Sequence, residues 1–363
     1  MFLALRDLRR GARRFMLLGV VIALVAVLST VLSGLATGLV TDGISGLRAL
    51  PFEHLAFQRG ADATFSRSTL RPAALEKFEA LSGVEATEVG SSFVNAASMD
   101  GGPSLDLALF GLSADSFLVE RPEARAALAD TPGLVLASEL RDEGVEVGDR
   151  YSLGGSNLVL PVVGFTFAGT YGHAPIAFTS LATWQQIQFG SGADGRYSAI
   201  ALRGGSNDAL DAAASATETD VLTKEAAFGG SPGYTAETTT MSLIRGFLLV
   251  ISALVIGAFF TVLTVQRTRQ IGLLKAMGAS NGYVLRDGIG QMAILVSAAT
   301  LGGVAIGCAL VLAVGRTKAP VELNVASVAT VALSLIVAGV GGSLVAFRRV
   351  TQIEPAIALG VEP

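Results

Sequence analysis

Residues Gln266–Arg286 read QRTRQIGLLKAMGASNGYVLR and stand between two long apolar runs, Phe247–Val265 and Ile289–Val314. The stretch opens with basic residues, continues with apolar residues at helical spacing, and ends in the small-residue sequence Gly278-Ala279-Ser280. A short amphipathic helix lying on a membrane surface has this pattern, whereas a plain solvated loop between two spans does not need it. We therefore predict a surface helix between two membrane spans.

The ends of the neighbouring helices can be predicted from the same stretch. Gly278 suits the left-handed conformation that often ends a helix. Ser280 or Asn281 is expected to cap the helix that follows.

Composition and charge indicate a membrane protein with one soluble part. The chain has 363 residues, a mean hydropathy of +0.58 and 15% charged residues. Residues 41–240 hold 12 Lys/Arg and 25 Asp/Glu, whereas the remainder holds 14 and 5. This separation follows the positive-inside rule, which predicts that the acidic insert lies outside the cell membrane and that both termini are cytoplasmic. The lone cysteine, Cys308, excludes an intrachain disulfide, and nothing favours nucleic-acid binding.

Four apolar segments are long enough to cross about 30 Å of hydrocarbon. A signal peptide is a weaker interpretation of the amino terminus, since the 26 residues from Phe15 to Val40 carry no charge and exceed a signal h-region. Gly34 and Gly38 in the first span would allow close helix packing, and a dimer face is one interpretation of them. The predicted segments are a cytoplasmic amphipathic helix 1–14, spans 15–40, 241–265, 288–314 and 321–346, an extracytoplasmic domain 41–240, a cytoplasmic segment 266–287, an outer hairpin 315–320 and a cytoplasmic tail 347–363.

The insert mixes helical and strand-like segments, so we predict an α+β domain between the first and second spans. The first span can extend to about Leu50. Asn207 or Asp208 is expected to cap a helix that runs to Ala216. The other expected elements are a helix over Leu70–Leu81 and strands over Glu88–Ala97, Leu105–Phe110, Gly133–Leu136, Asn157–Phe167 and Tyr197–Leu202.

The run from Gln266 to Ser280 resembles the signature of MacB/FtsX-type ABC transporter permeases, typically R-x-R-E-I-G-L-L-R-A-L-G-A-S. Gln270 and Lys275 depart from the usual Glu and Arg. Residues 347–359, which contain Phe-Arg-Arg-Val and Ile-Glu-Pro-Ala-Ile-Ala-Leu, resemble the closing motif of the same family. The positions of Gly133–Leu136 and Val147–Asp149 are similar to the family's extracytoplasmic domain.

This resemblance implies a non-catalytic permease that works as a homodimer with a separate dimeric ABC ATPase, which binds ATP and Mg²⁺. The chain itself has no P-loop, because none of its four lysines follows a glycine. By resemblance, the segment after the second span couples the permease to the ATPase. Its expected contact residues are Arg267, Arg269, Ile271, Leu274, Lys275, Met277 and Gly278.

Polar residues at the expected outer membrane surface form a candidate ligand site: Glu53, His54, Tyr171, His173, Tyr234 and Arg245. Tyrosine is a known ligand of ferric heme, and an arginine can pair with a propionate. The plainer interpretation is that the tyrosines are interfacial, that Glu53 and His54 are solvated, and that Arg245 snorkels. We also expect Phe52, Leu55 and Phe57 to offer a face to a porphyrin.

Heme-exporting members of the family resemble this chain in size, in the four-span layout and in the glutamate and tyrosines, which match Glu53, Tyr171 and Tyr234. The resemblance implies heme as a probable substrate and no covalent cofactor, with Glu53 and Tyr234 as iron ligands, Tyr171 lining or ligating, and His54 and His173 as alternatives. The substrate would come from membrane lipid. A non-transporting signalling protein of FtsX type, which would activate a cell-wall hydrolase, and an exporter of an antibiotic or lipoprotein remain open. A membrane enzyme is the least favoured function, since no nucleophile motif is present.

Overall fold

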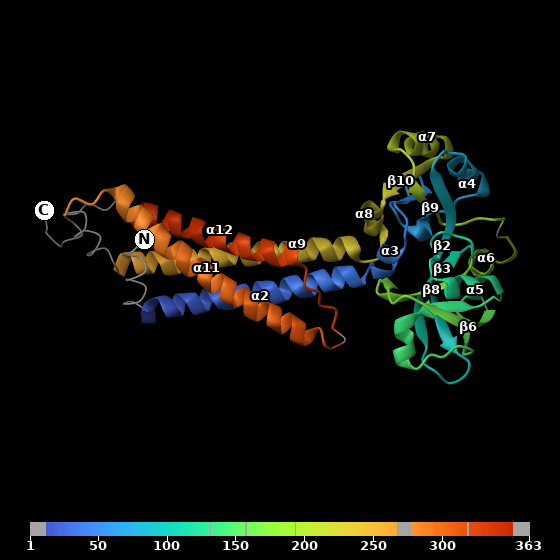
Figure 1. Ribbon diagram of the computed structural model, residues 1–363, viewed down its shortest axis with the longest axis horizontal. Coiled ribbons are helices and arrows are strands. Elements are labelled where there is room, and N and C mark those ends of the chain that lie inside the picture. Colours follow the sequence, from blue (N-terminus) through green and yellow to red (C-terminus); the bar gives the residue numbers. More distant parts are fainter. Residues whose placement is uncertain are drawn as a thin grey trace. The chain divides into compact units, whose positions relative to one another are not determined.

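The computed structural model describes residues 12–130, 132–156, 158–192, 194–266, 277–317 and 319–350 (Figure 1). The chain divides into two compact units. We call Met1–Leu39 with Thr238–Pro363 the helix unit, and Val40–Glu237 the sheet unit.

In its described residues, the helix unit has four long helices: α2 (Ala12–Asp42), α9 (Tyr234–Gln266), α11 (Asn281–Val314) and α12 (Val325–Val350). Each contains a stretch long and apolar enough to cross a membrane, namely Met16–Asp42, Tyr234–Phe259, Gly288–Val314 and Val325–Gly342. The prediction of four apolar spans is confirmed. The helices differ from the expected spans at their starts: α9 begins at Tyr234 where 241 was expected, α11 at Asn281 where 288 was expected, and α12 at Val325 where 321 was expected.

Glycines let α2 and α11 approach closely. A side chain at Gly303 would meet the Ala23 carbonyl at 2.4 Å, and one at Gly307 would meet Thr30 at 2.7 Å. Gly34 and Gly38 serve the same purpose toward the end of α11 and the loop after it, where Gly34 accepts a hydrogen bond from Glu322 N–H (3.0 Å). Gly34 and Gly38 are therefore packed against α11 and the following loop of the same chain. A dimer face was one interpretation of this pair from the sequence.

The sheet unit contains a ten-stranded sheet whose order is β10-β1-β9-β2-β3-β8-β4-β6-β5, with β7 paired to β8. Its long strand β2 pairs with β9 near its start, with β3 in its middle and with β5 at its end. Because β5 returns to β2, the strands from β2 through β3, β8, β4, β6 and β5 close into a ring. The strands are β1 (His54–Gln58), β2 (Val84–Ser98), β3 (Leu105–Leu112), β4 (Leu134–Ala137), β5 (Arg150–Leu153), β6 (Leu158–Thr166), β7 (Thr170–Tyr171), β8 (Ala174–Ser180), β9 (Ala199–Gly204) and β10 (Thr219–Thr223).

Helices pack against the sheet, with α4 on β2, α6 on β3 and α5 on β6 (Figure 1). Successive residues of β3 alternate between two cores: Leu107 and Leu109 pack in one, Ala108 and Phe110 in the other. Both faces of the sheet are therefore buried, which explains why its strands read as continuous apolar runs. The helices are α3 (Ser45–Ala49), α4 (Pro72–Glu79), α5 (Pro122–Asp130), α6 (Leu181–Phe189), α7 (Asn207–Thr217) and α8 (Lys224–Ala227), with 3₁₀ turns η1 (Phe65–Arg67), η2 (Ser138–Glu143), η3 (Gly190–Gly192) and η4 (Phe228–Gly230).

The predicted α+β class of the insert is confirmed, but several local predictions were wrong. Strands β1, β5, β7, β8 and β10 were not expected. The cap of α7 is Ser206, whose hydroxyl accepts from Ala209 N–H, in place of Asn207 or Asp208. The first span does not continue to Leu50, because α2 ends at Asp42 and a turn separates it from α3.

Candidate functional site

Most of the expected coupling segment, including Arg267, Arg269, Ile271, Leu274 and Lys275, lies outside the described residues. Its end is described. Met277 is 69% exposed, and Gly278 has a φ of +92°, the conformation expected of a residue that ends a helix. The Ser280 hydroxyl accepts from Tyr283 N–H at 3.2 Å and caps α11, which confirms one of the two predicted caps.

Glu53 and His54 lie at the start of β1, which is held between β9 and β10. The exposed Glu53 carboxylate accepts a hydrogen bond from Gly204 N–H (3.0 Å). His54 is half-buried, and its Nδ1 is enclosed without a hydrogen-bond partner in the described part of the chain. Glu53 is thus the more accessible of these two predicted ligands.

The apolar neighbours of Glu53 face inward. Phe52, Leu55 and Phe57 are buried in the sheet unit's core, so the expectation that they face a porphyrin was wrong. Lys224, which the sequence did not single out, covers this corner. Its ammonium lies 4.9 Å from the centre of the Phe52 ring and donates to the Leu50 carbonyl at 2.5 Å.

Tyr171 is 2% exposed, and its hydroxyl donates to the Gly230 carbonyl at 3.3 Å. Burial raises the pKa of this phenol well above its usual range. The Tyr171 ring stacks on Phe93, with the ring centres 5.7 Å apart and the planes 12° from parallel. Buried and already bonded, Tyr171 suits lining better than ligating.

A cavity of about 340 Å³ adjoins the Tyr171 ring, within the usual range for small-molecule sites. Five aromatic residues contribute to its wall, and hydroxyl side chains from 64–69, 91–92 and 198 complete it. Of the described residues that line it, none carries a charge. The cavity is therefore suited to the planar apolar face of a ligand, whose charged groups would lie outside it. Its aromatic residues are Phe65, Phe93, Tyr171, Trp184 and Phe189.

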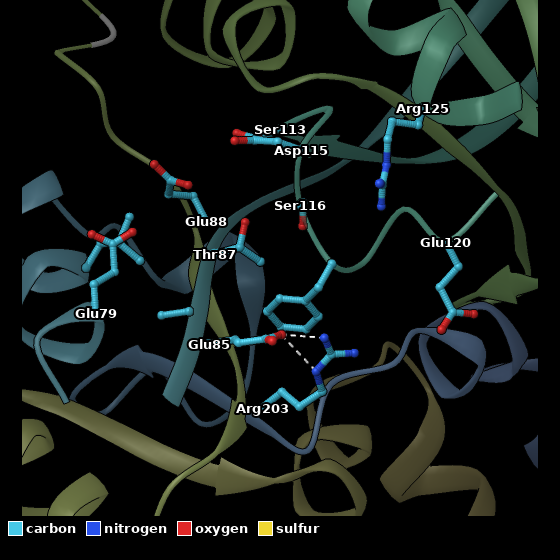
Figure 2. Close-up of a pocket in the computed structure, with 13 residues that line it drawn as sticks. Glu79, Glu85, Thr87, Glu88, Ser113, Asp115, Ser116, Glu120, Arg125 and Arg203 are labelled. Carbon is cyan, nitrogen blue, oxygen red and sulfur yellow. Dashed lines mark hydrogen bonds and ion pairs between the residues drawn. The ribbon is translucent and has the colours of Figure 1, made fainter. Parts of the chain in front are cut away.

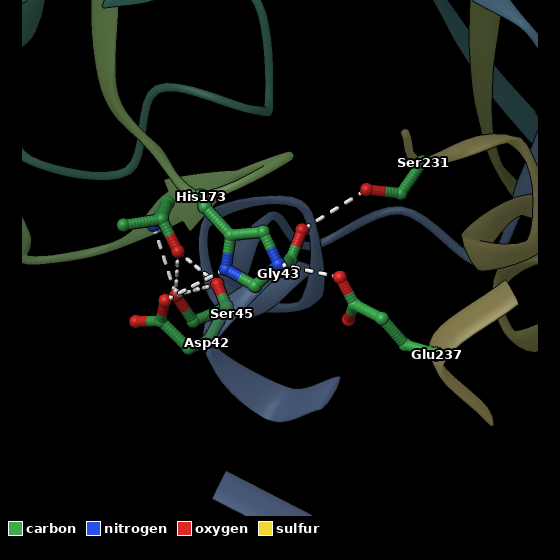
Figure 3. A network of polar contacts seen from close by, with 7 residues as sticks. Asp42, Gly43, Ser45, His173, Ser231 and Glu237 are labelled. Carbon is green, nitrogen blue, oxygen red and sulfur yellow. Dashed lines mark hydrogen bonds and ion pairs between the residues drawn. The ribbon is translucent and has the colours of Figure 1, made fainter. Parts of the chain in front are cut away.

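Tyr234 begins α9, and its half-buried ring lies 6.4 Å from the ring of Phe228. His173 sits between two carboxylates (Figure 3). Its Nδ1 is 3.0 Å from Asp42 Oδ2, and its Nε2 is 2.9 Å from Glu237 Oε1. Because both ring nitrogens have acidic partners, a ligand role for His173 would require one of these bonds to break.

Arg245 belongs to the helix unit. Its Nη2 donates to the Ser33 carbonyl (3.2 Å) and to the Thr37 hydroxyl (3.4 Å), both on α2. The guanidinium thus joins α9 to α2 and leaves further donors for an anion.

The structure brings only some of the predicted site residues together. Tyr171 belongs to one hydrophobic core of the sheet unit, and Tyr234 packs against that core. His173 lies two residues after Tyr171, in the turn of the same hairpin. Glu53 lies on the neighbouring sheet region and contacts β9. Sequence reasoning missed Asp42 and Glu237, because their partner, His173, is far away in the chain. The one signal in the sequence was that both residues lie at the ends of the insert.

A second and larger cavity, of about 950 Å³, opens in the sheet unit (Figure 2). Carboxylates dominate its wall, and the Arg203 guanidinium pairs with Glu85, with Nε 2.9 Å from Oε2. Arg125 is turned to the Val119 carbonyl, to which Nη2 donates at 2.8 Å. Such a wall disfavours an amphipathic anion, so we assign this cavity no part in substrate binding. Its acidic residues are Glu79, Glu85, Glu88, Asp115 and Glu120.

Comparison with known proteins identifies the carboxyl-terminal part of the chain. Residues 242–355 match the family model described as FtsX-like permease C-terminal. These residues form an FtsX-like permease domain. The domain contains most of α9 and all of α11 and α12, and the predicted coupling segment lies within it. With four apolar helices, this identifies a multi-pass membrane protein.

Curated relatives of the chain carry the provisional name hemin transport system permease protein HrtB. One from Staphylococcus epidermidis is 25% identical over 232 residues, which are 62% of this chain and 63% of that protein. The aligned part thus spans less than two thirds of that relative. Another, from Staphylococcus haemolyticus, is 22% identical over 99% of both chains.

The solved extracellular domain of the noncanonic ABC-type transporter YknZ from Gram-positive bacteria is also similar. It is 12% identical, with a TM-score of 0.34, and the match covers 47% of this chain and 98% of that domain.

Proposed function

We propose that this chain is the permease subunit of an ATP-driven ABC exporter, and that its substrate is hemin taken from the membrane. The observation that carries the proposal is the presence, in one chain, of an FtsX-like permease domain and of end-to-end similarity to a relative named for hemin transport. A separate ATPase supplies the energy, since the chain lacks the Gly-Lys of a P-loop.

The proposed mechanism is mechanical. Two copies of the chain would provide eight spans, and two coupling segments would dock on two ATPase subunits. In such helix-in-groove docking the apolar side chains provide the affinity, here Leu274 and Met277, and the basic residues form the rim. Closure of the ATPases on ATP then moves the first two spans as rigid bodies.

The proposed hemin site uses oxygen donors from the sheet unit. Tyr234 and Glu53 are the proposed iron ligands, because ferric iron accepts phenolate and carboxylate oxygen. Each has a position that supports this role: Tyr234 is half-buried against the aromatic core, and the Glu53 carboxylate is exposed. We assign Tyr171 to the wall of the aromatic cavity.

Hemin titration of the full-length permease tests this site. The wild type should give a saturable, high-spin spectrum of oxygen-ligated iron, and Tyr234→Phe should change it because the phenolate is lost. Glu53→Gln should also change it, and this substitution keeps an oxygen that can accept from Gly204 N–H. Trp184, the only tryptophan, lines the aromatic cavity, so its fluorescence should be quenched as hemin binds.

Two matched variants serve as controls. Tyr283→Phe removes an exposed tyrosine from α11. Glu225→Gln removes an exposed carboxylate next to Lys224, whose N–H donates to the Glu53 carbonyl (2.9 Å). Both variants should keep the wild-type spectrum. Wild-type spectra in both Tyr234→Phe and Glu53→Gln would refute the ligand assignment. Absence of saturable hemin binding by the wild type would refute hemin as the substrate.

A further inference from the structure

The two covalent connections between the units both pass through one polar cluster. The sheet unit begins at Val40 and ends at Glu237, and the cluster includes Asp42 and Glu237 themselves. Figure 3 shows the His173 imidazole lying between these two carboxylates. We call this group the His173 clasp; it consists of Asp42, Gly43, Ser45, Thr170, His173, Ser231 and Glu237.

Neutral hydrogen bonds hold the same segments together. The Gly43 carbonyl accepts from Gly172 N–H at 2.8 Å and from the Ser231 hydroxyl at 3.0 Å. The Ser45 hydroxyl accepts from Thr170 N–H at 2.9 Å, and the Thr170 hydroxyl donates to the Asp42 carbonyl. The residues after α2, the β7–β8 hairpin and the residues before α9 are thus joined at one point.

His173 has a backbone conformation that few residues other than glycine adopt. Gly172 and His173 form a two-residue connection between β7 and β8, with φ values of +58° and +64°. Positive φ at both residues is the hairpin geometry that favours Asn-Gly or Gly-Gly, and a non-glycine residue there is uncommon. Histidine adopts this conformation more often than most non-glycine residues, and here the turn places its imidazole between the two carboxylates.

Electrostatics explain why the carboxylates need a cation. Asp42 is the last residue of α2, where the helix dipole disfavours a negative charge. A third carboxylate adds to this: burial, and then the charges of Asp42 and Glu143, raise the pKa of Glu139 on η2. The hydrogen bonds to Asp42 and Glu237 raise the pKa of His173 despite its partial burial.

We propose that the His173 clasp is a positioning element, which holds the two connections at a fixed separation and passes movement of α2 and α9 to the sheet through β8. The route into the sheet is direct, because β8 pairs with β3 on one side and with β4 on the other. The transmission part rests on the proposed function; the clasp itself does not.

The charged part of the clasp depends on pH in a defined direction. A histidine whose pKa is raised in the folded state contributes stability below its unfolded pKa of about 6.5, and loses it as the pH rises through the folded pKa. The ion pairs are therefore complete below about pH 6.5 and weaken as the pH rises through the raised pKa of His173, whereas the Gly43 hydrogen bonds do not change.

The test uses the full-length permease with its ATPase in lipid nanodiscs, with His173→Asn as the variant. Asparagine tolerates a positive φ but carries no charge and is too short to bridge both carboxylates. Amide exchange at Gly172 and Glu237 should be about 10-fold faster than in the wild type at pH 6, with a smaller ratio at pH 8, as expected for lost charge-assisted bonds. Glu237→Gln should give the same trend.

Asp62→Asn is the matched control. Asp62 also has a positive φ (+51°) and an ion pair, with Arg67 at 2.7 Å, but that pair is exposed and joins nearby residues. Exchange at Gly172 and Glu237 should be unchanged in this variant. Wild-type exchange in His173→Asn would refute the clasp.

Function is measured on the same variants, reconstituted with the ATPase into sealed lipid vesicles, because nanodiscs enclose no compartment into which hemin could be exported. In His173→Asn, hemin exported per ATP hydrolysed should fall at least about fivefold while hemin affinity stays constant, since the binding residues are untouched. Unchanged export with faster exchange would refute the transmission role, and lost affinity would make His173 a ligand. If the wild type exports no hemin, the proposed function fails, while the exchange result still decides the clasp.

Discussion

The helix unit and the sheet unit use the same apolar residue types in opposite ways. Large apolar side chains of the spans point outward: Leu254 on α9, for example, is 67% exposed. In the sheet unit Phe110 and Trp184 are buried, and both faces of β3 are covered. The difference reflects the solvent, because lipid accepts apolar surface that water rejects.

Close packing is achieved differently in the two units. In the helix unit the contacts between helices depend on missing side chains, as at Gly303 and Gly307, which let backbones touch. In the sheet unit glycines make room for one large ring: side chains at Gly90 or Gly111 would overlap Trp184 at 2.3–2.4 Å. The stability of the helix unit should therefore fall when atoms are added at its glycines. The stability of the sheet unit should fall both when atoms are added at its glycines and when the Trp184 ring is removed.

The largest effect is expected from Trp184→Ala. Loss of this buried ring, and of its hydrogen bond to the Ser92 hydroxyl (3.0 Å), should destabilise the sheet unit by about 3–5 kcal/mol. Amide exchange of β2 and β3 in the full-length protein measures it. Phe93→Ala is the control, since Phe93 lines the same cavity but is 51% exposed and should cost much less. Equal losses would contradict the core role of Trp184.

Two exposed residues, one in each unit, test whether the surface of α9 faces lipid and the surface of the sheet unit faces water. Leu254→Asp places a charge in the apolar part of a span and should impair insertion by up to about 2.5–3.5 kcal/mol, the cost at the centre of a span. Val147, 61% exposed in the sheet unit, should tolerate the same change within about 0.5 kcal/mol. The yield of folded protein in the membrane measures both, and similar yields would contradict the assignment of α9 as a span.

The smallest of these effects is expected from adding one methyl group to neighbouring glycines of α11. Gly303→Ala would clash with α2 and should cost about 1–3 kcal/mol, because backbone atoms cannot move aside easily. Gly302→Ala meets no described atom within 4 Å and should be neutral or slightly stabilising. Thermal stability of the purified permease compares them; a neutral Gly303→Ala would show that α2 and α11 do not pack this closely.

Local patterns predicted much of the fold. Uninterrupted apolar length was enough for the spans, and serine before a helical run was enough for the cap at Ser280. Local sequence patterns did not predict the strands whose formation depends on pairing with other strands. The short strand β1 and the strand β8, which has buried residues on both faces, are formed by partners distant in sequence. No local signal assigns such pairings.

The candidate site was less predictable than the fold for the same reason. Glu53, Tyr171 and Tyr234 were chosen by residue type, yet burial and a bond to Gly230 turn Tyr171 into a wall residue. The bonds of His173 to Asp42 and Glu237 join residues separated by 131 and 64 positions. Only the folded chain shows that these three meet.

The central proposal is that the permease exports hemin, and that a separate ATPase drives this export through the FtsX-like domain. The most direct measurement is ATP-dependent hemin movement across vesicles that contain the permease and its ATPase, compared with Leu274→Asp and with Val147→Asp as the control. We predict hemin export by the wild type and the control, and loss of both export and hemin-stimulated ATP hydrolysis in Leu274→Asp, because a charge removes the apolar anchor. Full export by Leu274→Asp, or none by an ATPase-active wild-type complex, would contradict the account.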